Sequence, residues 1–201
     1  MKKIYLITHA EASHSVENKV GGWYDSHLTK LGVEKAKTLT EKIESFGAKI
    51  GDLAVYSSDL LRCKQTTEII MAENVSNIIF DARLREMCFG NNEGIDQKEH
   101  EKVMQPTCST SNRLDHRICS GAESRRELAE RIKSFVDEIM NEKGDVLIVT
   151  HGFAATFVVA TFQKLEISNM GYISYRFTPG SVSILVEDDV FQNRTLKLLN
   201  G

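Results

Sequence analysis

Two histidines occupy equivalent positions at the ends of two predicted strands. His9 follows the apolar run 4–7, and His151 follows the apolar run 146–149. Each histidine precedes a small residue, so each imidazole is expected to project from the carboxyl edge of a buried strand. In an open parallel α/β sheet, ligands bind at that edge. The two rings therefore predict one site built from opposite ends of the chain.

A neutral imidazole at such a site can act as a nucleophile near pH 7 and form a covalent intermediate. Phosphoryl transfer needs a nucleophile, cations around the phosphoryl oxygens and an acid for the leaving oxygen. We assign the nucleophile to His9, and to His151 a hydrogen bond to a phosphate oxygen. The alternative for each ring is a histidine whose hydrogen bonds are satisfied at a strand end.

Arg62 supplies the cation in this hypothesis. It falls in the first turn of a helix predicted over residues 59–72. Unpaired backbone N–H groups and the positive end of the helix dipole already favour an anion there. The planar guanidinium also matches the oxygens of a phosphate. A surface ion pair of Arg62 with Glu68 or Asp59 is the alternative.

Glu86, within Leu84-Arg85-Glu86, is the candidate general acid. An exposed glutamate is ionised at neutral pH, so this role requires partial burial or neighbouring carboxylates. A salt bridge from Glu86 to Arg83 or Arg85 is the alternative.

The elements that must position these residues alternate between apolar runs and helical periodicity, which is typical of an α/β domain. Strands are predicted over residues 3–8, 53–56, 78–80, 145–150, 181–186 and 195–199. The last two are expected to form an antiparallel pair at one sheet edge. Poor periodicity over about 91–121 predicts a cap or insertion over the sheet edge, within a single domain that covers 1–201.

Capping residues mark the predicted helices. Thr29 is expected to begin one helix that runs to Gly47, and the 57–59 cluster is expected to cap the helix that carries Arg62. Ser124 and Glu127 form a capping box for a third. The expected apolar face of the first helix comprises Leu28, Leu31, Ala36, Leu39, Ile43 and Phe46.

The composition limits the class of protein. With 201 residues, 41% hydrophobic and 26% charged, the chain fits a soluble globular protein. The net charge of −3 argues against nucleic-acid binding, and no apolar run approaches membrane-spanning length. The four cysteines lack C-x-x-C spacing and no signal-peptide core follows Met1, so we expect a reduced, cytoplasmic protein.

Several sequence blocks resemble the histidine phosphatase superfamily, in the branch that contains cofactor-dependent phosphoglycerate mutases and related phosphatases. They are Thr8-His9-Ala10-Glu11, residues 22–32 (GWYDSHLTKLG), 58–66 (SDLLRCKQT), 84–94 (LREMCFGNNEG), Gly121-Ala122-Glu123-Ser124 and Val149-Thr150-His151-Gly152. The resemblance spans the chain. It implies a three-layer α/β/α sandwich with a mostly parallel sheet, in which His9 is phosphorylated, Arg62 and His151 hold phosphate, and Glu86 donates the proton.

Thr8 is the main departure from the family pattern, because the family has an arginine there that binds the transferred phosphoryl group. Ser15 stands where an asparagine is usual, and Ala10 replaces a glycine. A hydroxyl carries no charge, and loss of one preorganised donor commonly costs about 10²–10³ in rate. We therefore expect reduced activity and a phosphate-binding set of Arg62, Thr8, His14 and Ser15.

Candidates for the substrate pocket lie in two segments. Gly22 and Trp23 form the first, and Arg113, His116 and Arg117 belong to the insertion. His14 and these three insertion residues are also candidate replacements for the missing arginine. Charges on a solvated loop are the alternative for the insertion residues.

The sequence thus predicts a phosphatase that acts on a small phosphorylated metabolite through phospho-His9, without a metal or cofactor. No H-x-x-x-H helix pattern points to zinc. Two alternatives stay open, a phosphoglycerate-type mutase and a weak or silent protein that binds phosphorylated ligands or inorganic phosphate. A homo-oligomer also stays open, whereas nucleic-acid and membrane partners are not expected.

Overall fold

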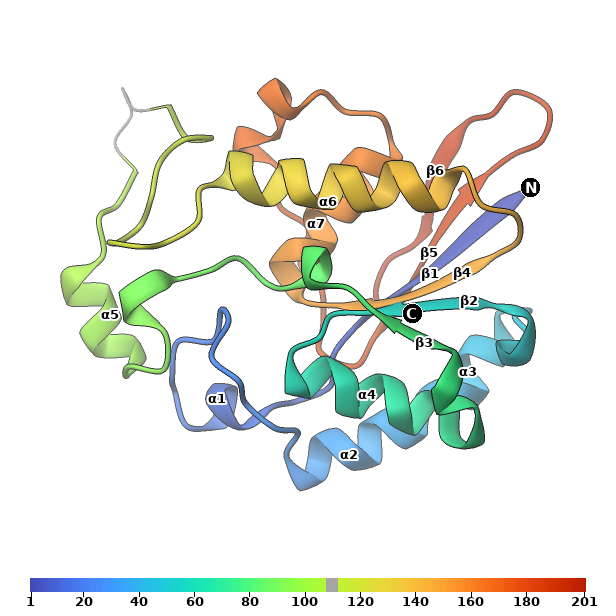
Figure 1. Ribbon diagram of the computed structural model, residues 1–201, viewed down its shortest axis with the longest axis horizontal. Helices are drawn as coiled ribbons and strands as arrows, with labels where there is room; N and C mark the ends of the chain where they lie inside the picture. The colour runs from blue at the N-terminus through green and yellow to red at the C-terminus, as the bar shows by residue number, and fades with distance from the viewer. Residues whose placement is uncertain (108–111) are drawn as a thin grey trace.

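The computed structural model describes residues 1–107 and 112–201. Its strands form a six-stranded sheet in the order β3-β2-β4-β1-β5-β6 (Figure 1). The strands are β1 (Lys2–Thr8), β2 (Ala54–Ser57), β3 (Ile78–Phe80), β4 (Val146–Thr150), β5 (Val182–Glu187) and β6 (Arg194–Leu198). Strands β1 to β4 run parallel, and β5 and β6 form the predicted antiparallel pair at one edge.

Helices cover both faces of this sheet. They are α1 (Ser13–Val16), α2 (Lys30–Lys37), α3 (Leu39–Ser45), α4 (Leu61–Met71), α5 (Gln97–Val103), α6 (Arg125–Met140) and α7 (Gly152–Phe162). Figure 1 shows α6 and α7 on one side of the sheet and α2, α3 and α4 on the other. The three-layer α/β/α sandwich is therefore confirmed. In the described part of the chain, no helix is long and apolar enough to cross a membrane.

Alternation along β1 divides the core between the two faces. Ile4 and Leu6 belong to a buried cluster with the apolar residues of α6 and α7. Tyr5 and Ile7 belong to a second buried cluster, with apolar residues of α2, α3 and α4. Successive side chains of a strand point to opposite faces, so a strand covered on both sides is apolar throughout.

The pairing of β1 with β4 sets the position of both histidines. Thr8 pairs with Thr150 at the end of the parallel register. The backbone N–H of His9 then donates to the Thr150 carbonyl at 3.0 Å. His9 and His151 consequently leave neighbouring strands at the same carboxyl edge, as the two apolar runs predict.

The helix expected from Thr29 to Gly47 is two helices. Thr29 caps α2 as predicted, since its hydroxyl accepts from the Gly32 N–H at 3.0 Å. Thr38 then separates α2 from α3, and its hydroxyl donates to the Lys35 carbonyl at 2.8 Å. A short polar side chain that bonds to its own helix backbone competes with regular helical bonding. Leu31, expected on the apolar face, is 67% exposed.

The cap of α4 also differs from the prediction. The helix begins at Leu61 rather than Asp59. Its N-cap residue is Leu60, whose side chain accepts no hydrogen bond. The Asp59 carboxylate is bound by Arg85 at 2.5 Å, so it is unavailable for capping. Asp25, from a distant loop, accepts from the Leu61 N–H at 2.7 Å instead. Arg62 nevertheless remains in the first turn.

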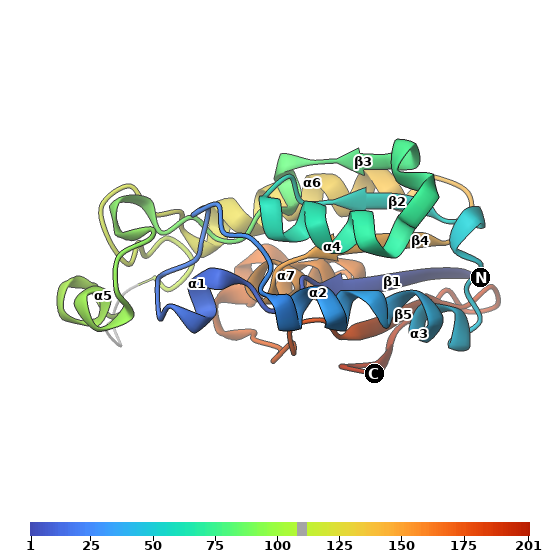
Figure 2. The same cartoon turned by 90° about the horizontal axis from the view of Figure 1, so that it is seen from below.

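Residues 91–121 lie beyond the carboxyl edge of the sheet, so far as they are described. Figures 1 and 2 both place α5 at the end of the molecule opposite the N-terminus. The Asn91 N–H donates to the Ser120 carbonyl at 3.1 Å, and Phe89 forms a β-bridge with Ala122. The segment thus leaves and rejoins the body of the protein at one place, from which it can cover the histidines.

Candidate active site

Arg62 joins the two histidine rings. Its Nε lies 3.2 Å from Nε2 of His9 and 3.2 Å from Nδ1 of His151. The centroids of the two rings are 5.1 Å apart. The three side chains, from the ends of β1 and β4 and from the first turn of α4, therefore converge on one point.

Hydrogen bonding fixes the tautomer of His9. Nδ1 lies 2.7 Å from the Ala10 carbonyl, which can only accept, so Nδ1 carries the proton. Nε2 then keeps its lone pair and accepts from Arg62. Burial, followed by the charge of Arg62, lowers the pKa of His9 to about 3. The ring is therefore neutral at pH 7, with Nε2 as the nitrogen able to attack an electrophile.

His151 is completely buried behind Arg62. Because its Nδ1 accepts from Arg62, its Nε2 carries the proton and donates to Oγ of Ser58 at 2.8 Å. Burial, with the Arg62 charge second, holds the pKa of His151 well below its usual range. Both ring nitrogens are thus engaged by protein groups. A direct hydrogen bond from His151 to phosphate stays a prediction that requires this arrangement to change.

Backbone carbonyls orient the guanidinium of Arg62, whose side chain is 1% exposed. Its two terminal nitrogens donate to the carbonyls of Gly22 at 2.6 Å and Tyr24 at 2.9 Å. These hydrogen-bond partners are neutral, and no carboxylate among the described residues forms an ion pair with Arg62, although the charges of Glu86, Asp25 and Glu93 act on it from a distance. A buried cation without an ion-pair partner is suited to bind an anion.

Glu86 lies at the N-terminus of α7. Its Oε2 accepts from the backbone N–H of Phe153 at 3.0 Å. Its Oε1 accepts from the N–H groups of Ala154 at 3.0 Å and Met87 at 2.9 Å. Each carboxyl oxygen has two acceptor positions, so Oε2 retains one that can carry a proton. Glu86 is therefore fixed in orientation while one oxygen can exchange a proton with a ligand.

The ion pairs considered as alternatives for Arg62 and Glu86 do not form within the described residues. Arg85 pairs with Asp59 at 2.5 Å, and Arg83 pairs with Asp81 at 2.6 Å. Asp59 and Arg85, each a candidate partner, thus bind each other, and Arg83 is engaged by Asp81 rather than by Glu86.

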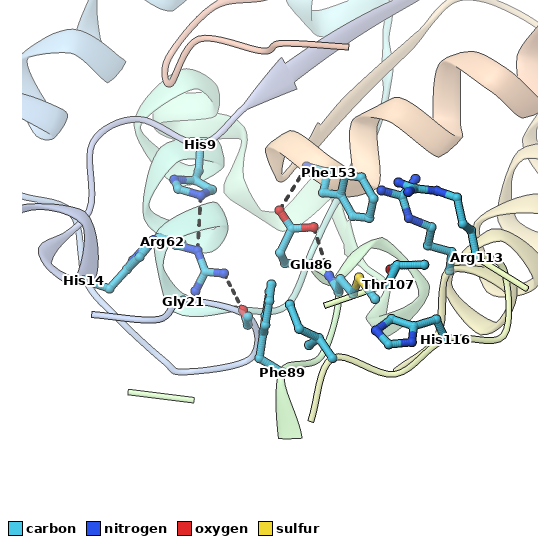
Figure 3. A pocket seen from close by; sticks show the side chains of 14 residues that line it. His9, His14, Gly21, Arg62, Glu86, Phe89, Thr107, Arg113, His116 and Phe153 are labelled. Carbon is cyan, nitrogen blue, oxygen red and sulfur yellow. Dashed lines mark hydrogen bonds between the residues drawn. The ribbon is translucent and has the colours of Figure 1, made fainter. Parts of the chain in front are cut away.

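A cavity of about 440 Å³ opens in front of His9, Arg62 and Glu86 (Figure 3). Figure 3 shows Glu86 between the His9–Arg62 side and a far side that includes Arg113 and His116. The lining residues are His9, His14, Gly21, Gly22, Arg62, Glu86, Met87, Phe89, Thr107, Arg113, His116, Ile118, Arg125 and Phe153. A small organic phosphate fits a cavity of this size.

The remaining predicted phosphate ligands are placed differently. Thr8 is buried, and its hydroxyl donates to the Thr178 carbonyl at 2.7 Å, away from the cavity. The geometry therefore gives no support to Thr8 as a phosphate ligand. His14 does line the cavity, and burial lowers its pKa to about 4, with Arg62 as the second cause. Ser15 is exposed, lies outside this cavity and contacts His14 at 3.2 Å.

The substrate-pocket candidates also divide into two groups. Gly22, Arg113 and His116 line the cavity. Trp23 and Arg117 do not. Trp23 packs on the outer side, where its Nε1 donates to the Glu86 carbonyl at 2.7 Å. Arg117 points away because it pairs with Glu127 at 2.5 Å.

Some cavity residues were missed in the sequence. Arg125 and Phe153 are the clearest cases. Arg125 sits in the first turn of α6, where the positive end of the helix dipole disfavours a cation. A basic residue at such a position was a signal of another role. Ser58, which the sequence places in a helix cap and in the 58–66 block, is also the hydrogen-bond partner of His151.

A metal site finds no support in this geometry. Across residues 1–107 and 112–201, no group of three histidine, cysteine or acidic side chains is placed to hold a metal ion. His9 and His151 both accept from the Arg62 guanidinium instead, and the His14 ring lies 6.1 Å from that of His9.

The fold and this site define a protein of the histidine phosphatase class. Residues 4–200 match the family model of the histidine phosphatase superfamily, branch 1. The chain therefore belongs to that superfamily, as the sequence blocks predict.

Relatives and similar structures are named for two kinds of activity. The chain is 31% identical over 169 residues to an Escherichia coli protein named "Probable phosphoglycerate mutase GpmB". The aligned region covers 82% of this chain and 76% of the relative. Mycobacterial glucosyl-3-phosphoglycerate phosphatase superposes with a TM-score of 0.81 at 22% identity, covering all of both chains. Alpha-ribazole phosphatase from Shigella flexneri superposes with a TM-score of 0.79 at 22% identity, covering 99% and 96%. The two structures establish the fold alone.

Proposed function

We propose that this protein is a phosphatase that hydrolyses a small phosphorylated metabolite through a phosphohistidine on His9. The observation that carries the proposal is the unprotonated Nε2 of His9, a cavity-lining residue, whose lone pair accepts a hydrogen bond from the neighbouring Arg62. The proposal also rests on membership of a superfamily whose relatives are named phosphatases and phosphoglycerate mutases.

The first chemical step is transfer of the phosphoryl group to the protein. Nε2 of His9 attacks phosphorus while the bond from phosphorus to the ester oxygen breaks. Glu86 gives its proton to that oxygen, which leaves as an alcohol. Arg62 transfers its Nε–H bond from the histidines to the phosphoryl oxygens and stabilises their charge.

The second step removes the phosphoryl group. A water attacks phosphorus, the bond from phosphorus to Nε2 breaks, and the Glu86 carboxylate accepts the proton of the water. Inorganic phosphate leaves, and His9 and Glu86 return to their starting states. In this scheme no metal or cofactor takes part. We also propose a cytoplasmic location, since the cysteine spacing favours a reducing compartment.

Rapid quenching with ³²P-labelled substrate tests the covalent step. We expect an acid-labile, base-stable label on the native protein and none on His9→Ala, whose kcat/KM falls at least about 10³-fold. His27→Ala, which removes an exposed histidine, is the control. A native protein that releases phosphate at the same rate as His9→Ala would disprove the proposal and favour a silent binding protein.

A mutase is the second candidate, because the curated relatives at 31% identity carry that name. A mutase must return the phosphoryl group to the substrate and exclude water from phospho-His9. Product analysis with a phosphoglycerate separates the two functions. Phosphate without an isomerised product supports the phosphatase, and an isomer that exceeds phosphate supports the mutase.

A further inference from the structure

The cavity has a pair of cations, separate from Arg62, on the side away from His9. Figure 3 shows Arg113 across Glu86 from His9 and Arg62. Arg125 lines the same cavity from the first turn of α6. The phosphatase chemistry proposed above uses neither residue, so their presence needs a separate explanation.

Most arginines outside the cavity are neutralised. Those that pair with a carboxylate are Arg83, Arg85, Arg117, Arg126, Arg131 and Arg194. The cavity arginines Arg62, Arg113 and Arg125 have no carboxylate partner among residues 1–107 and 112–201, and the sequence 108–111 contains no acidic residue. In a chain of net charge −3, this cavity therefore gathers three arginines without an ion-pair partner among the described residues, and Glu86 is the one carboxylate among its lining residues.

Arg113 and Arg125 are held next to each other. Nε of Arg113 and a terminal nitrogen of Arg125 donate to the same Gly171 carbonyl, at 3.0 and 3.1 Å. Their guanidiniums lie over the rings of Tyr172, at 4.6 Å, and Phe153, at 4.9 Å. Each guanidinium has five N–H donors, so most remain for a ligand.

Placing two like charges together is unfavourable unless an anion binds between or beside them. Burial lowers the pKa of Arg125, and the charge of Arg113 lowers it further. Stacking on aromatic faces and the shared Gly171 carbonyl hold the pair in place despite this repulsion. Paired guanidiniums of this kind suit the oxygens of a carboxylate or a phosphate.

Besides the Glu86 carboxylate, which lies between the two cationic sites, the cavity has an apolar lining. Met87, Phe89, Ile118 and Phe153 make up this lining. A neutral sugar would leave hydroxyl groups unpaired against these four side chains, which costs free energy. A ligand with an apolar middle and an anionic group at each end matches the cavity.

We propose that Arg113 and Arg125 form a second anion-binding subsite, and that the substrate is a phosphomonoester with a second anionic group beyond an apolar spacer. That group is a carboxylate or a second phosphate. The inference rests on the proposed function, because the scissile phosphoryl group occupies the His9 end.

Titration calorimetry with non-hydrolysable phosphonates tests this subsite without turnover. The matched probes are 4-carboxybenzylphosphonate and its neutral isostere 4-carbamoylbenzylphosphonate, and para-xylylene bisphosphonate is the two-phosphonate probe. We expect the native protein to bind the carboxy or bisphosphonate probe at least about tenfold more tightly than the carbamoyl probe. Whichever of these two binds more tightly identifies the second group.

The variants are Arg113→Gln and Arg125→Gln, with Arg176→Gln as the control for loss of one exposed charge. Each cavity variant should lose the preference for the charged probe and keep its affinity for the carbamoyl probe within threefold. Arg176→Gln should keep both affinities.

Three results would overturn the subsite. The native protein binds the charged and carbamoyl probes equally, or binds none of the three, or the cavity variants weaken all probes alike, as a purely structural role predicts. Failure of the proposed function is seen separately, as absence of label on His9 with the phosphonate preference intact.

Discussion

The imidazoles of His9 and His151 stand edge to face, with centroids 5.1 Å apart and an interplanar angle of 65°. One N–H of Arg62 is shared between them. Both hydrogen bonds from this one N–H are weak, because the two acceptor nitrogens cannot both lie along the direction of the N–H bond. An incoming phosphoryl oxygen can therefore take this donor at small cost, which leaves the His9 lone pair facing phosphorus.

Arg62→Lys should remove this shared contact. A lysine ammonium is a point charge and cannot reach both rings and both loop carbonyls. We expect kcat/KM to fall by about 10²–10³ and the free energy of unfolding to fall by about 1–3 kcal/mol, because the carbonyls of Gly22 and Tyr24 lose their donors. Steady-state kinetics and urea unfolding measure both effects. Arg176→Lys is the matched control, and a similar loss there would contradict the prediction.

Glu86→Gln should slow the hydrolysis of phosphate esters, and the loss of rate should be larger for esters whose leaving group must be protonated. An amide keeps the size of the side chain but cannot act as the acid. We expect kcat to fall by about 10²–10⁴ for an alkyl phosphate and by less than about tenfold for 4-nitrophenyl phosphate, whose anion leaves unprotonated. The two substrates are compared on one protein preparation. Equal losses on both would show that Glu86 acts through structure alone.

Thr8→Val should leave turnover within threefold of the native rate, because the Thr8 hydroxyl is directed to the Thr178 carbonyl. Stability should fall by about 1 kcal/mol, since that carbonyl loses its donor. A large loss of turnover in Thr8→Val would place the hydroxyl on phosphate after all.

Thr8→Arg tests the departure from the family pattern. A guanidinium restores a charged donor beside His9, so kcat/KM should rise, by up to about 10²–10³ if no other cation compensates. An unchanged rate in a correctly folded variant would show that the native site is already complete. Circular dichroism checks folding, because position 8 is buried.

Acid should destabilise the protein through its buried histidines. The pKa of His9 is lowered to about 3 and that of His14 to about 4, against 6.5 in the unfolded chain. Between pH 6.5 and about 4 the unfolded state therefore binds more protons, and stability falls as the pH decreases. Each group contributes a slope of up to about 1.4 kcal/mol per pH unit.

His14→Gln should reduce that slope, measured by urea unfolding at pH 7, 6, 5 and 4.5. His27→Gln, at an exposed position, is the control. If both variants retain the full native slope, burial of His14 does not govern the acid response.

The sequence alone determined the local elements of this protein, namely its buried strands and the starts of some helices. The apolar runs before His9 and His151 specify buried strands, because side chains alternate along a strand whatever the rest of the chain does. The capping box of Ser124 and Glu127 forms as expected, since its hydrogen bonds join residues three apart. Arg62 lies in the first helical turn for the same local reason.

Tertiary structure decided which groups those residues meet. The partners of Arg62 are carbonyls of a loop some forty positions earlier, and Asp25 from that loop caps α4. Trp23 and Arg117 were expected in the cavity and lie outside it, whereas Arg125 lies inside. Spacing in the sequence gives no distance between such segments. Their contacts depend on how the loops pack over the sheet edge, where hydrogen-bond geometry and charge select one partner among several within reach.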